Sequence, residues 1–198
     1  VKCSRIERGD ELMEYLDIVD EMGNPTGEIV EREYAHRHGI RHRTSHVWLL
    51  RKKQDVEILL QKRSLNKDSY PGCYDISSAG HIPAGSDFET SALRELKEEL
   101  GVEATKGELH YIGTSYSNSH NVFHEKPFHN VQVSHVYVLW YDGDFVLQKE
   151  EVEEVQWMPL AKCQQLVLHK QIPHCIKIEE LQMIDYYLKG VNNESISQ

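Results

Sequence analysis

Cysteine is scarce in this chain, and the few cysteines lie far apart. Only 4 of the 198 residues are cysteine, and no two of them form a C-x-x-C pair. This spacing lacks the dense framework of a disulfide-stabilised secreted domain and the paired ligands of a structural zinc site. We therefore expect reduced thiols and a cytoplasmic protein. The cysteines are Cys3, Cys73, Cys163 and Cys175.

Long apolar runs are also missing. No stretch approaches the roughly 18–20 apolar residues that a membrane-spanning helix requires. The first residues, VKCSRIERGD, lack the apolar segment of a secretory signal. These two absences predict that the protein has no membrane partner.

Positive charge is in deficit. Lysine and arginine together number 22 and aspartate and glutamate 32, so the net charge is −10 with neutral histidine. Proteins that bind long nucleic acids are usually basic, which argues against such a ligand. A small phosphorylated ligand is not excluded, because a local positive site or a bound metal is enough to hold it.

The remaining composition is that of an ordinary globular domain. Hydrophobic residues make up 39% and charged residues 27% of the chain. Predicted strands and helices alternate without a regular βαβ rhythm, which favours one α/β (α+β) domain with a mixed sheet flanked by helices. We expect three parts: an N-terminal hairpin extension (1–37), a core (38–165), and a C-terminal helix with its tail (166–198).

Local patterns predict individual elements of this domain. Residues 14–33 have an extended pattern interrupted by the turn residues G-N-P-T-G, which predicts a hairpin. Residues 113–130 are polar with isolated aromatics and are predicted as a loop. Apolar spacing in 176–188 predicts a helix that ends at Gly190, before a disordered tail. Further strands are predicted at 46–51, 56–62 and 131–141.

A short acidic segment, SALRELKEELGV at 91–102, has the pattern of a helix with marked ends. Ser86 and Glu89 fit the S-x-x-E capping box, with Ser86 as the N-cap. Gly101 is a natural stop just after the last turn. The leucines of the segment repeat at helical spacing, so the pattern predicts an amphipathic helix. These leucines are Leu93, Leu96 and Leu100.

Three carboxylates crowd the polar face of this helix. At about 100° per residue, Glu95, Glu98 and Glu99 fall within roughly 100° of arc. A solvated charged face is the ordinary interpretation. Two features favour a bound cation instead: Arg94 can hold the Glu98 carboxylate from four residues away, and the turn at 80–85 can bring backbone close to a ligand. Carboxylate oxygens suit Mg²⁺ or Mn²⁺, which commonly also contact substrate phosphates.

The segment GHIPAGSDFETSALRELKEELGV, residues 80–102, resembles the Nudix box, G-x5-E-x7-R-E-U-x-E-E-x-G-U, with U bulky and aliphatic. Ser86 stands where this pattern has its first glutamate, which leaves the number of metal ions open. The resemblance extends over residues 12–165 and is closest to the isopentenyl-diphosphate-isomerase-like branch. It implies a Nudix-type α/β/α sandwich with a mixed sheet, an N-terminal β-hairpin and a C-terminal helix. The matching positions are Gly80, Arg94, Glu95, Leu96, Glu98, Glu99, Gly101 and Val102.

This resemblance implies a hydrolase that cleaves a diphosphate linkage with Mg²⁺ or Mn²⁺. The substrate would be a nucleoside diphosphate derivative or a similar small diphosphate. Glu95, Glu98 and Glu99 are the expected metal ligands, and Arg94 would orient Glu98. The general base would be a glutamate of the box or one from a distant loop, for which Glu151 is the candidate. The family commonly dimerises, which leaves a homodimer open.

Further residues are candidates for the same site. Arg63 and Lys67 could bind phosphate oxygens, although each could equally be a surface cation. His81 could shape the substrate pocket or could have a structural role. Asp87 or Glu89 could compensate for the glutamate that the box lacks.

An isomerase is the first alternative. In isopentenyl-diphosphate isomerases, histidines hold a metal, and three histidines fall near matching places here. Ala79 stands in place of the catalytic cysteine and Gln132 in place of the catalytic glutamate, and neither can protonate an alkene. The matching histidines are His42 and His81, with His36 or His38 near a third position.

A binding module is the second alternative. The missing glutamate of the box would suit a protein that senses a nucleotide or nucleotide-sugar without cleaving it. A hydrolase releases phosphate-containing products with a divalent cation, a sensor is stabilised by its ligand without product, and an isomerase converts its substrate with no phosphate released.

Overall fold

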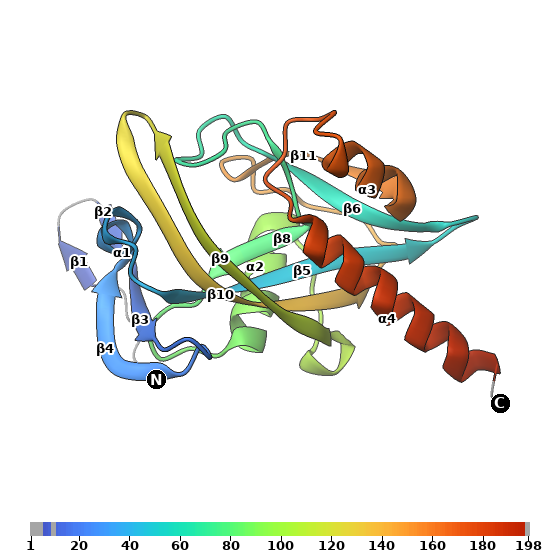
Figure 1. Cartoon of the computed structure of the whole chain (residues 1–198), viewed down its shortest axis with the longest axis horizontal. Coiled ribbons are helices and arrows are strands. Elements are labelled where there is room, and N and C mark those ends of the chain that lie inside the picture. The colour runs from blue at the N-terminus through green and yellow to red at the C-terminus, as the bar shows by residue number, and fades with distance from the viewer. Residues whose placement is uncertain (1–5, 9–10, 197–198) are drawn as a thin grey trace.

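A mixed sheet of seven strands forms the centre of the molecule (Figure 1). The structure, a computed structural model, describes residues 6–8 and 11–196, with side chains from 13 to 191. The main path runs β11-β6-β5-β10-β9, while β7 pairs with β6 and β8 with β5. Strands β5 and β10 are parallel, and the other pairs are antiparallel. The strands are β5 (His42–Lys52), β6 (Val56–Arg63), β7 (Tyr74–Asp75), β8 (Ser78–His81), β9 (His110–Phe123), β10 (Lys126–Trp140) and β11 (Val152–Pro159).

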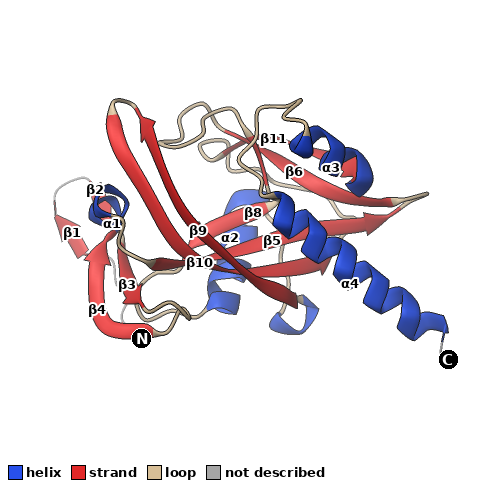
Figure 2. Ribbon diagram, in the orientation of Figure 1, coloured by secondary structure: helices blue, strands red, loops and turns tan. Residues whose placement is uncertain are grey.

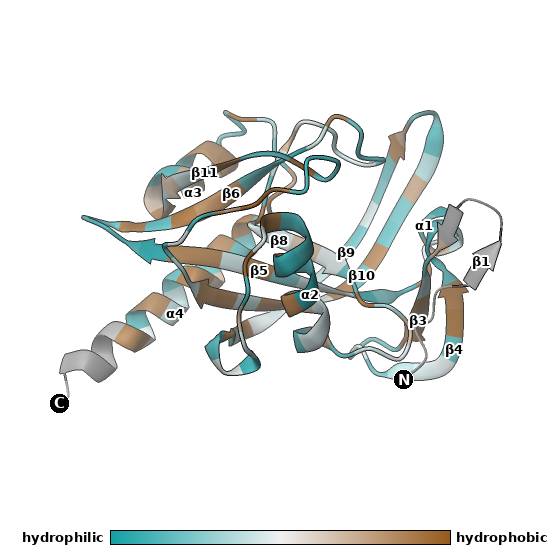
Figure 3. Cartoon of the chain, turned by 180° about the vertical axis from the view of Figure 1, so that it is seen from behind, coloured by the Kyte–Doolittle hydropathy of each residue, from teal (hydrophilic) through white to brown (hydrophobic). Residues whose placement is uncertain are grey.

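Apolar side chains cover both faces of the sheet. Successive strand residues point to opposite faces, so Trp48 and Leu50 of β5 join one core cluster and Val47 and Leu49 the other. Helix α2 packs on the second cluster, and α3 and α4 pack on the first (Figures 1 and 3). The expected α/β/α sandwich is confirmed (Figure 2). The helices are α2 (Phe88–Leu100), α3 (Leu160–Leu168) and α4 (Ile178–Ile196).

The N-terminal segment forms the predicted hairpin and a helix that was not predicted. Strands β3 and β4 pair antiparallel, and α1 follows β4 directly. Leu16, Val30 and Ala35 form a small apolar cluster that joins the hairpin to α1. The hairpin and α1 lie beside the β9–β10 end of the central sheet in Figure 1. The elements are β1 (Ile6–Arg8), β2 (Glu11–Met13), β3 (Tyr15–Val19), β4 (Pro25–Glu31) and α1 (Arg32–His38).

The predicted loop at 113–130 is wrong. These residues belong to the long hairpin of β9 and β10, whose register runs from Phe123 opposite Lys126 to His110 opposite Val138. Asparagine has a low intrinsic preference for strands, but cross-strand pairing along the hairpin overrides that preference. The hairpin rises well above the rest of the sheet (Figure 1).

Two predicted helix ends also differ. Asp87 is the N-cap of α2, with its Oδ1 accepting from the Thr90 backbone N–H at 2.8 Å, whereas the Ser86 hydroxyl contacts Ser91 Oγ at 3.2 Å. Helix α4 continues through Gly190 to Ile196, so the predicted stop and the disordered tail are wrong over the described residues. One glycine costs a helix only about 1 kcal/mol, too little to end it.

The described cysteines and helices bear on two expectations from composition, reduced thiols and no membrane-spanning helix. Cys73, Cys163 and Cys175 are free thiols, while Cys3 lies outside the described residues. Among the helices that the structure describes, none combines the length and apolar character needed to cross a bilayer.

Candidate functional site

The Glu95 side chain of helix α2 packs directly against Gly80 of strand β8. A Cβ placed on Gly80 would stand 2.1 Å from Glu95 Cδ and 2.2 Å from Glu95 Oε1. Real Cβ atoms do not tolerate such contacts, so only glycine leaves room for this carboxylate. The first glycine of the acidic motif thus makes space for one of its glutamates.

Glu99 points inward rather than to solvent. Glu99 is only 5% exposed. Its Oε2 accepts from Ser78 Oγ at 2.7 Å and from the Ala79 backbone N–H at 3.3 Å. Burial, followed by the nearby charge of Glu95, raises the pKa of Glu99 to about 8. A positive charge beside such a buried carboxyl group would stabilise its ionised form.

Arg94 holds the other two glutamates of the helix. Its Nη1 donates to Glu98 Oε2 at 2.7 Å, and its Nη2 donates to Glu95 Oε1 at 2.5 Å. Burial raises the pKa of Glu95 to about 7, against the lowering effect of the Arg94 charge. The side chain of Glu98 is 47% exposed, so one carboxylate of the three faces open solvent.

These glutamates line a cleft of about 220 Å³, here called the carboxylate cleft. Its rim carries an ion pair between Lys67 and Glu151, from two loops far apart in sequence. A second pair, Arg32 Nη1 to Glu14 Oε2 at 3.4 Å, comes from the N-terminal segment. The cleft therefore combines hard oxygen ligands with lysine and arginine cations. Its predicted residues are Lys67, His81, Arg94, Glu95, Glu98, Glu99 and Glu151.

Some predicted residues lie elsewhere. Arg63 donates to Asp75 Oδ2 at 2.9 Å and to the Ser69 carbonyl at 3.0 Å, and it lines a neighbouring cavity instead of the cleft. Asp87 and Glu89 face Lys106, at 3.2 and 3.4 Å, and neither lines the carboxylate cleft. They therefore do not replace the glutamate that the motif lacks.

Glu14 and Arg32 are cleft residues that the sequence did not reveal. Both come from the N-terminal segment, more than 40 positions before the motif. Neither belongs to a recognisable pattern, so only the packing of the N-terminal hairpin and α1 brings them to the cleft. Glu14 is the additional carboxylate of this site.

Three histidines meet beside the cleft. Ligand nitrogens of His36, His42 and His81 lie within 4.8 Å of one another, and the Nε2 atoms of His36 and His81 are 3.3 Å apart. Nδ1 of His42 contacts the Ile40 carbonyl at 2.9 Å, and its buried Nε2 has no hydrogen-bond partner among the described residues. His38 instead stacks on Tyr34.

Burial keeps these histidines neutral. It lowers the pKa of His36 to about 3, that of His42 to about 4, and that of His81 well below its usual range. Neutral imidazole nitrogens are the form that binds transition metals. The histidine cluster can therefore hold a metal by its donor set.

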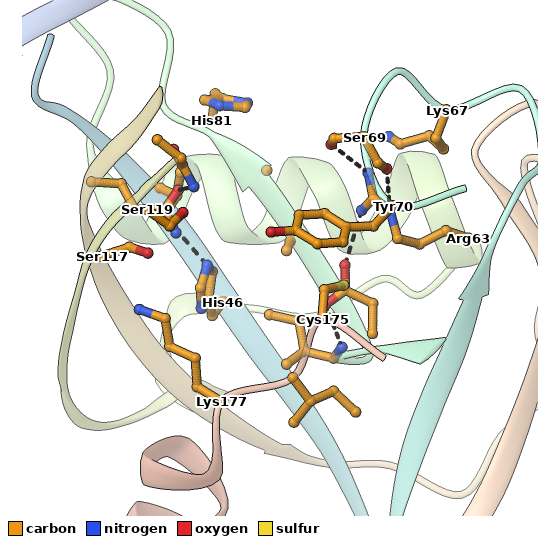
Figure 4. A pocket seen from close by; sticks show the side chains of 18 of the residues that line it. His46, Arg63, Lys67, Ser69, Tyr70, His81, Ser117, Ser119, Cys175 and Lys177 are labelled. Carbon is orange, nitrogen blue, oxygen red and sulfur yellow. Dashed lines mark hydrogen bonds and ion pairs between the residues drawn. The ribbon is translucent and has the colours of Figure 1, made fainter. Parts of the chain in front are cut away.

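A second cavity adjoins the cleft, here called the polar cavity. It has a volume of about 330 Å³ and shares Lys67, Gly80 and His81 with the carboxylate cleft. In Figure 4, Ser117, Ser119, His46 and Lys177 lie along one side of this cavity, and Arg63, Ser69 and Tyr70 along the other. The two hollows therefore join an acidic cleft, whose carboxylates suit a cation, to a polar cavity that also contains lysine and arginine side chains.

Known proteins resemble this chain over most of its length. Residues 40–176 match the family model of the NUDIX domain. Nudix hydrolase 3 of Arabidopsis thaliana is 40% identical over 151 residues, which cover 74% of this chain but only 19% of that protein. The chain thus spans about a fifth of that relative. An isopentenyl-diphosphate Delta-isomerase of Jannaschia sp. is 32% identical over 150 residues, covering 73% of this chain and 78% of the isomerase.

Solved structures share the fold. The DR0079 protein of Deinococcus radiodurans superposes with a TM-score of 0.63 at 20% identity, covering 85% of this chain and 98% of that one. The NUDIX domain of Shewanella oneidensis NrtR, complexed with ADP ribose, superposes with a TM-score of 0.53 at 22% identity, covering 75% and 87%. At these identities the likeness concerns the fold.

Proposed function

Because the chain belongs to the Nudix family, we propose that it hydrolyses the diphosphate linkage of a small molecule with the help of Mg²⁺ or Mn²⁺. The observation that carries this proposal is the carboxylate cleft, in which three glutamates of one helix lie together with lysine and arginine side chains. A diphosphate is strongly anionic, so its hydrolysis requires charge neutralisation at the phosphate oxygens.

Glu95, Glu98 and Glu99 are the proposed ligands of the cation. Their oxygens are the hard donors that Mg²⁺ and Mn²⁺ prefer, and the space left by Gly80 keeps the Glu95 carboxylate at the cleft. When bound, the cation supplies charge neutralisation and makes water a better nucleophile near neutral pH. Glu99 is buried and the Glu95 side chain is only 15% exposed, so a cation would also offset the cost of ionising them.

The remaining cleft residues receive positioning and proton-transfer roles. Arg94 orients Glu98 and Glu95 through its two hydrogen bonds. Lys67 and His81, at the junction of the two cavities, would bind the substrate, with Lys67 pairing a phosphate oxygen. A carboxylate of the cleft, Glu98 or Glu151, takes the proton of the attacking water. Both face the cleft, and neither is deeply buried.

Arg63 is proposed as a positioning residue for this site. Its guanidinium is occupied by Asp75 and by the Ser69 carbonyl, which leaves it poorly placed to bind phosphate directly. The contact with Ser69 instead holds the loop that carries Lys67. Arg63 would thus act on phosphate binding through Lys67.

A panel of diphosphates tests the proposed reaction. ADP-ribose, diadenosine tetraphosphate and isopentenyl diphosphate are incubated with the protein and Mg²⁺ or Mn²⁺, and the products are separated by anion exchange. We expect phosphate-containing products from at least one compound, and a return to the uncatalysed rate when EDTA removes the cation. Thermal stabilisation by a compound without any product would contradict hydrolysis and indicate a sensor.

An isomerase is the second candidate function, favoured by the histidine cluster and by the 32% identical isomerase. Ala79 and Gln132 oppose it. Ala79 has no ionisable group, and Gln132 is an amide that donates to Ser134 Oγ at 3.2 Å. An isomerase would convert isopentenyl diphosphate without releasing phosphate, so the same panel separates the two functions.

A further inference from the structure

Polar side chains replace apolar ones along the part of the sheet that faces the polar cavity. In the register of β9 and β10, Ser117 lies opposite Gln132 and Ser119 opposite Asn130. Residues directly opposite each other in an antiparallel pair project to the same face, and all four line the cavity. If these positions only packed against neighbouring side chains, apolar residues would suit them better. The polar side chains facing the cavity therefore indicate a ligand.

Glu180 anchors a hydrogen-bonded chain that begins at the floor of this cavity. The residue is 1% exposed, and its two oxygens accept from Trp48 Nε1 at 3.2 Å and contact His46 Nδ1 at 2.9 Å. Burial opposes ionisation, but the interactions with His46, Ser115 and Trp48 together outweigh it and lower the pKa of Glu180. Indole N–H can only donate, so Glu180 acts as an acceptor and Nδ1 of His46 carries a proton.

The chain continues from His46 to Asn130. Nε2 of His46 contacts Thr44 Oγ1 at 3.3 Å. Gln132 Nε2 donates to Ser134 Oγ at 3.2 Å, which leaves the Ser134 hydroxyl to donate to Thr44 Oγ1 at 2.7 Å. Gln132 Oε1 accepts from Asn130 Nδ2 at 2.9 Å. The donors from Asn130 to Ser134 therefore point toward Glu180.

The orientation of the Asn130 amide is a consequence of this chain. Its nitrogen is committed to Gln132, so its Oδ1 is the atom left over. That oxygen is buried and has no hydrogen-bond partner among the described residues. Leaving a buried carbonyl unpaired is unfavourable, and a ligand donor would remove that cost.

We propose that Asn130 determines specificity: its Oδ1 selects substrates whose non-phosphate group carries a hydroxyl or amino donor, such as a sugar, over substrates with a hydrocarbon group. This rests on the proposed hydrolase function, in which the carboxylate cleft holds the diphosphate. The adjoining polar cavity then receives the attached group, because Lys67, Gly80 and His81 line both hollows.

Lys177 complements Asn130 in the same cavity. Its ammonium group donates to the Tyr116 carbonyl at 2.6 Å and to Ser115 Oγ at 3.3 Å. An ammonium has three N–H groups, so one remains for a ligand oxygen. The cavity thus offers an acceptor and a donor, which suits hydroxyl groups because they can serve as both.

Calorimetry with two non-hydrolysable probes tests the proposal. The probes are the methylene-bridged analogues of ADP-ribose and of isopentenyl diphosphate, each titrated into the protein with Mg²⁺. We expect the ADP-ribose analogue to bind at least about 10-fold more tightly. Asn130→Leu should weaken it by roughly 5- to 100-fold while changing the isopentenyl analogue less than about 2-fold.

Two further variants make the result specific. Asn130→Asp keeps an acceptor in the same shape but loses the donor to Gln132 Oε1; a turn of the Gln132 amide lets its Nε2 donate to the second Asp oxygen. This variant should retain the preference, which also shows that position 130 tolerates substitution. Asn118→Leu is the matched control, because Asn118 is an exposed residue of the same hairpin outside the cavity.

The proposal is overturned if wild-type protein binds the isopentenyl analogue as tightly, or if Asn130→Leu weakens both probes equally. Hydrolysis of the unmodified compounds is measured separately. Preferred cleavage of isopentenyl diphosphate would leave the hydrolase function standing and remove only this inference, whereas binding without any cleavage would remove the function on which it rests.

Discussion

Glu99→Gln is expected to abolish cation-dependent hydrolysis and, at the same time, to stabilise the metal-free protein. Glutamine has the same shape and can still accept from Ser78 Oγ and the Ala79 backbone N–H. It removes a charge that burial makes costly, since the pKa of Glu99 is raised from 4.5 to about 8. The rate should fall by at least about 100-fold, as for loss of a metal-site group.

The pH dependence of stability follows from the direction of this shift. A carboxyl group with a raised pKa binds more protons when folded, so the metal-free wild-type protein loses stability as the pH rises from about 4.5 to about 8. The variant lacks this loss. Above pH 8, its free energy of unfolding should exceed that of wild type by about 2 kcal/mol or more.

Urea unfolding in EDTA at pH 6 and pH 9 measures this effect. Glu103→Gln is the matched control, because its side chain is 76% exposed and pairs only with Lys97 among the described residues. The control should stay within about 0.5 kcal/mol of wild type. An unchanged hydrolysis rate for Glu99→Gln would show that Glu99 is not a ligand of the catalytic cation. Lower stability of the variant than of wild type at pH 9 would show that burial of the ionised carboxylate does not destabilise the metal-free protein.

Gly80→Ala should remove most activity while leaving the fold intact. The added methyl group would stand 2.1 Å from Glu95 Cδ, so the Glu95 carboxylate must leave its place. This carboxylate is the end of a flexible side chain, and it can move without backbone rearrangement. We expect kcat to fall by about 10²-fold, with a change in unfolding free energy of about 1 kcal/mol.

Steady-state kinetics and urea unfolding on the same preparations check this result. Gly107→Ala is the control, since a Cβ at that position meets no atom within 4 Å. If Gly80→Ala hydrolyses diphosphates at the wild-type rate, the position of the Glu95 carboxylate against Gly80 has no role in catalysis.

The acidic motif was predictable because its residues are close in sequence on one regular helix. Helical spacing alone places Glu95, Glu98 and Glu99 near one another and Arg94 beside Glu98. Helical spacing did not reveal that Glu99 is buried, because that depends on where β8 crosses α2. The capping box was similarly ambiguous, since Ser86 and Asp87 are adjacent and both are good N-caps.

The polar cavity could not be predicted, because its parts come from five distant segments. Alternating small polar residues at Ser115, Ser117 and Ser119 were a signal for a strand with one polar face. The isolated aromatic residues and the polar composition of the segment hid this two-residue alternation, so the segment was predicted as a loop. The role of Glu180 depends on a contact 134 positions away, with His46, which no local pattern contains. The choice of His36 over His38 depends equally on how α1 packs.

The most direct test of the proposed metal site is anomalous scattering from crystals soaked with Mn²⁺ and the methylene analogue of ADP-ribose. We predict a manganese peak about 2.1 Å from carboxylate oxygens of Glu95, Glu98 and Glu99, in contact with the phosphates of the analogue. A peak confined to the histidine cluster, or no peak beside these glutamates at a concentration that supports hydrolysis, would contradict it.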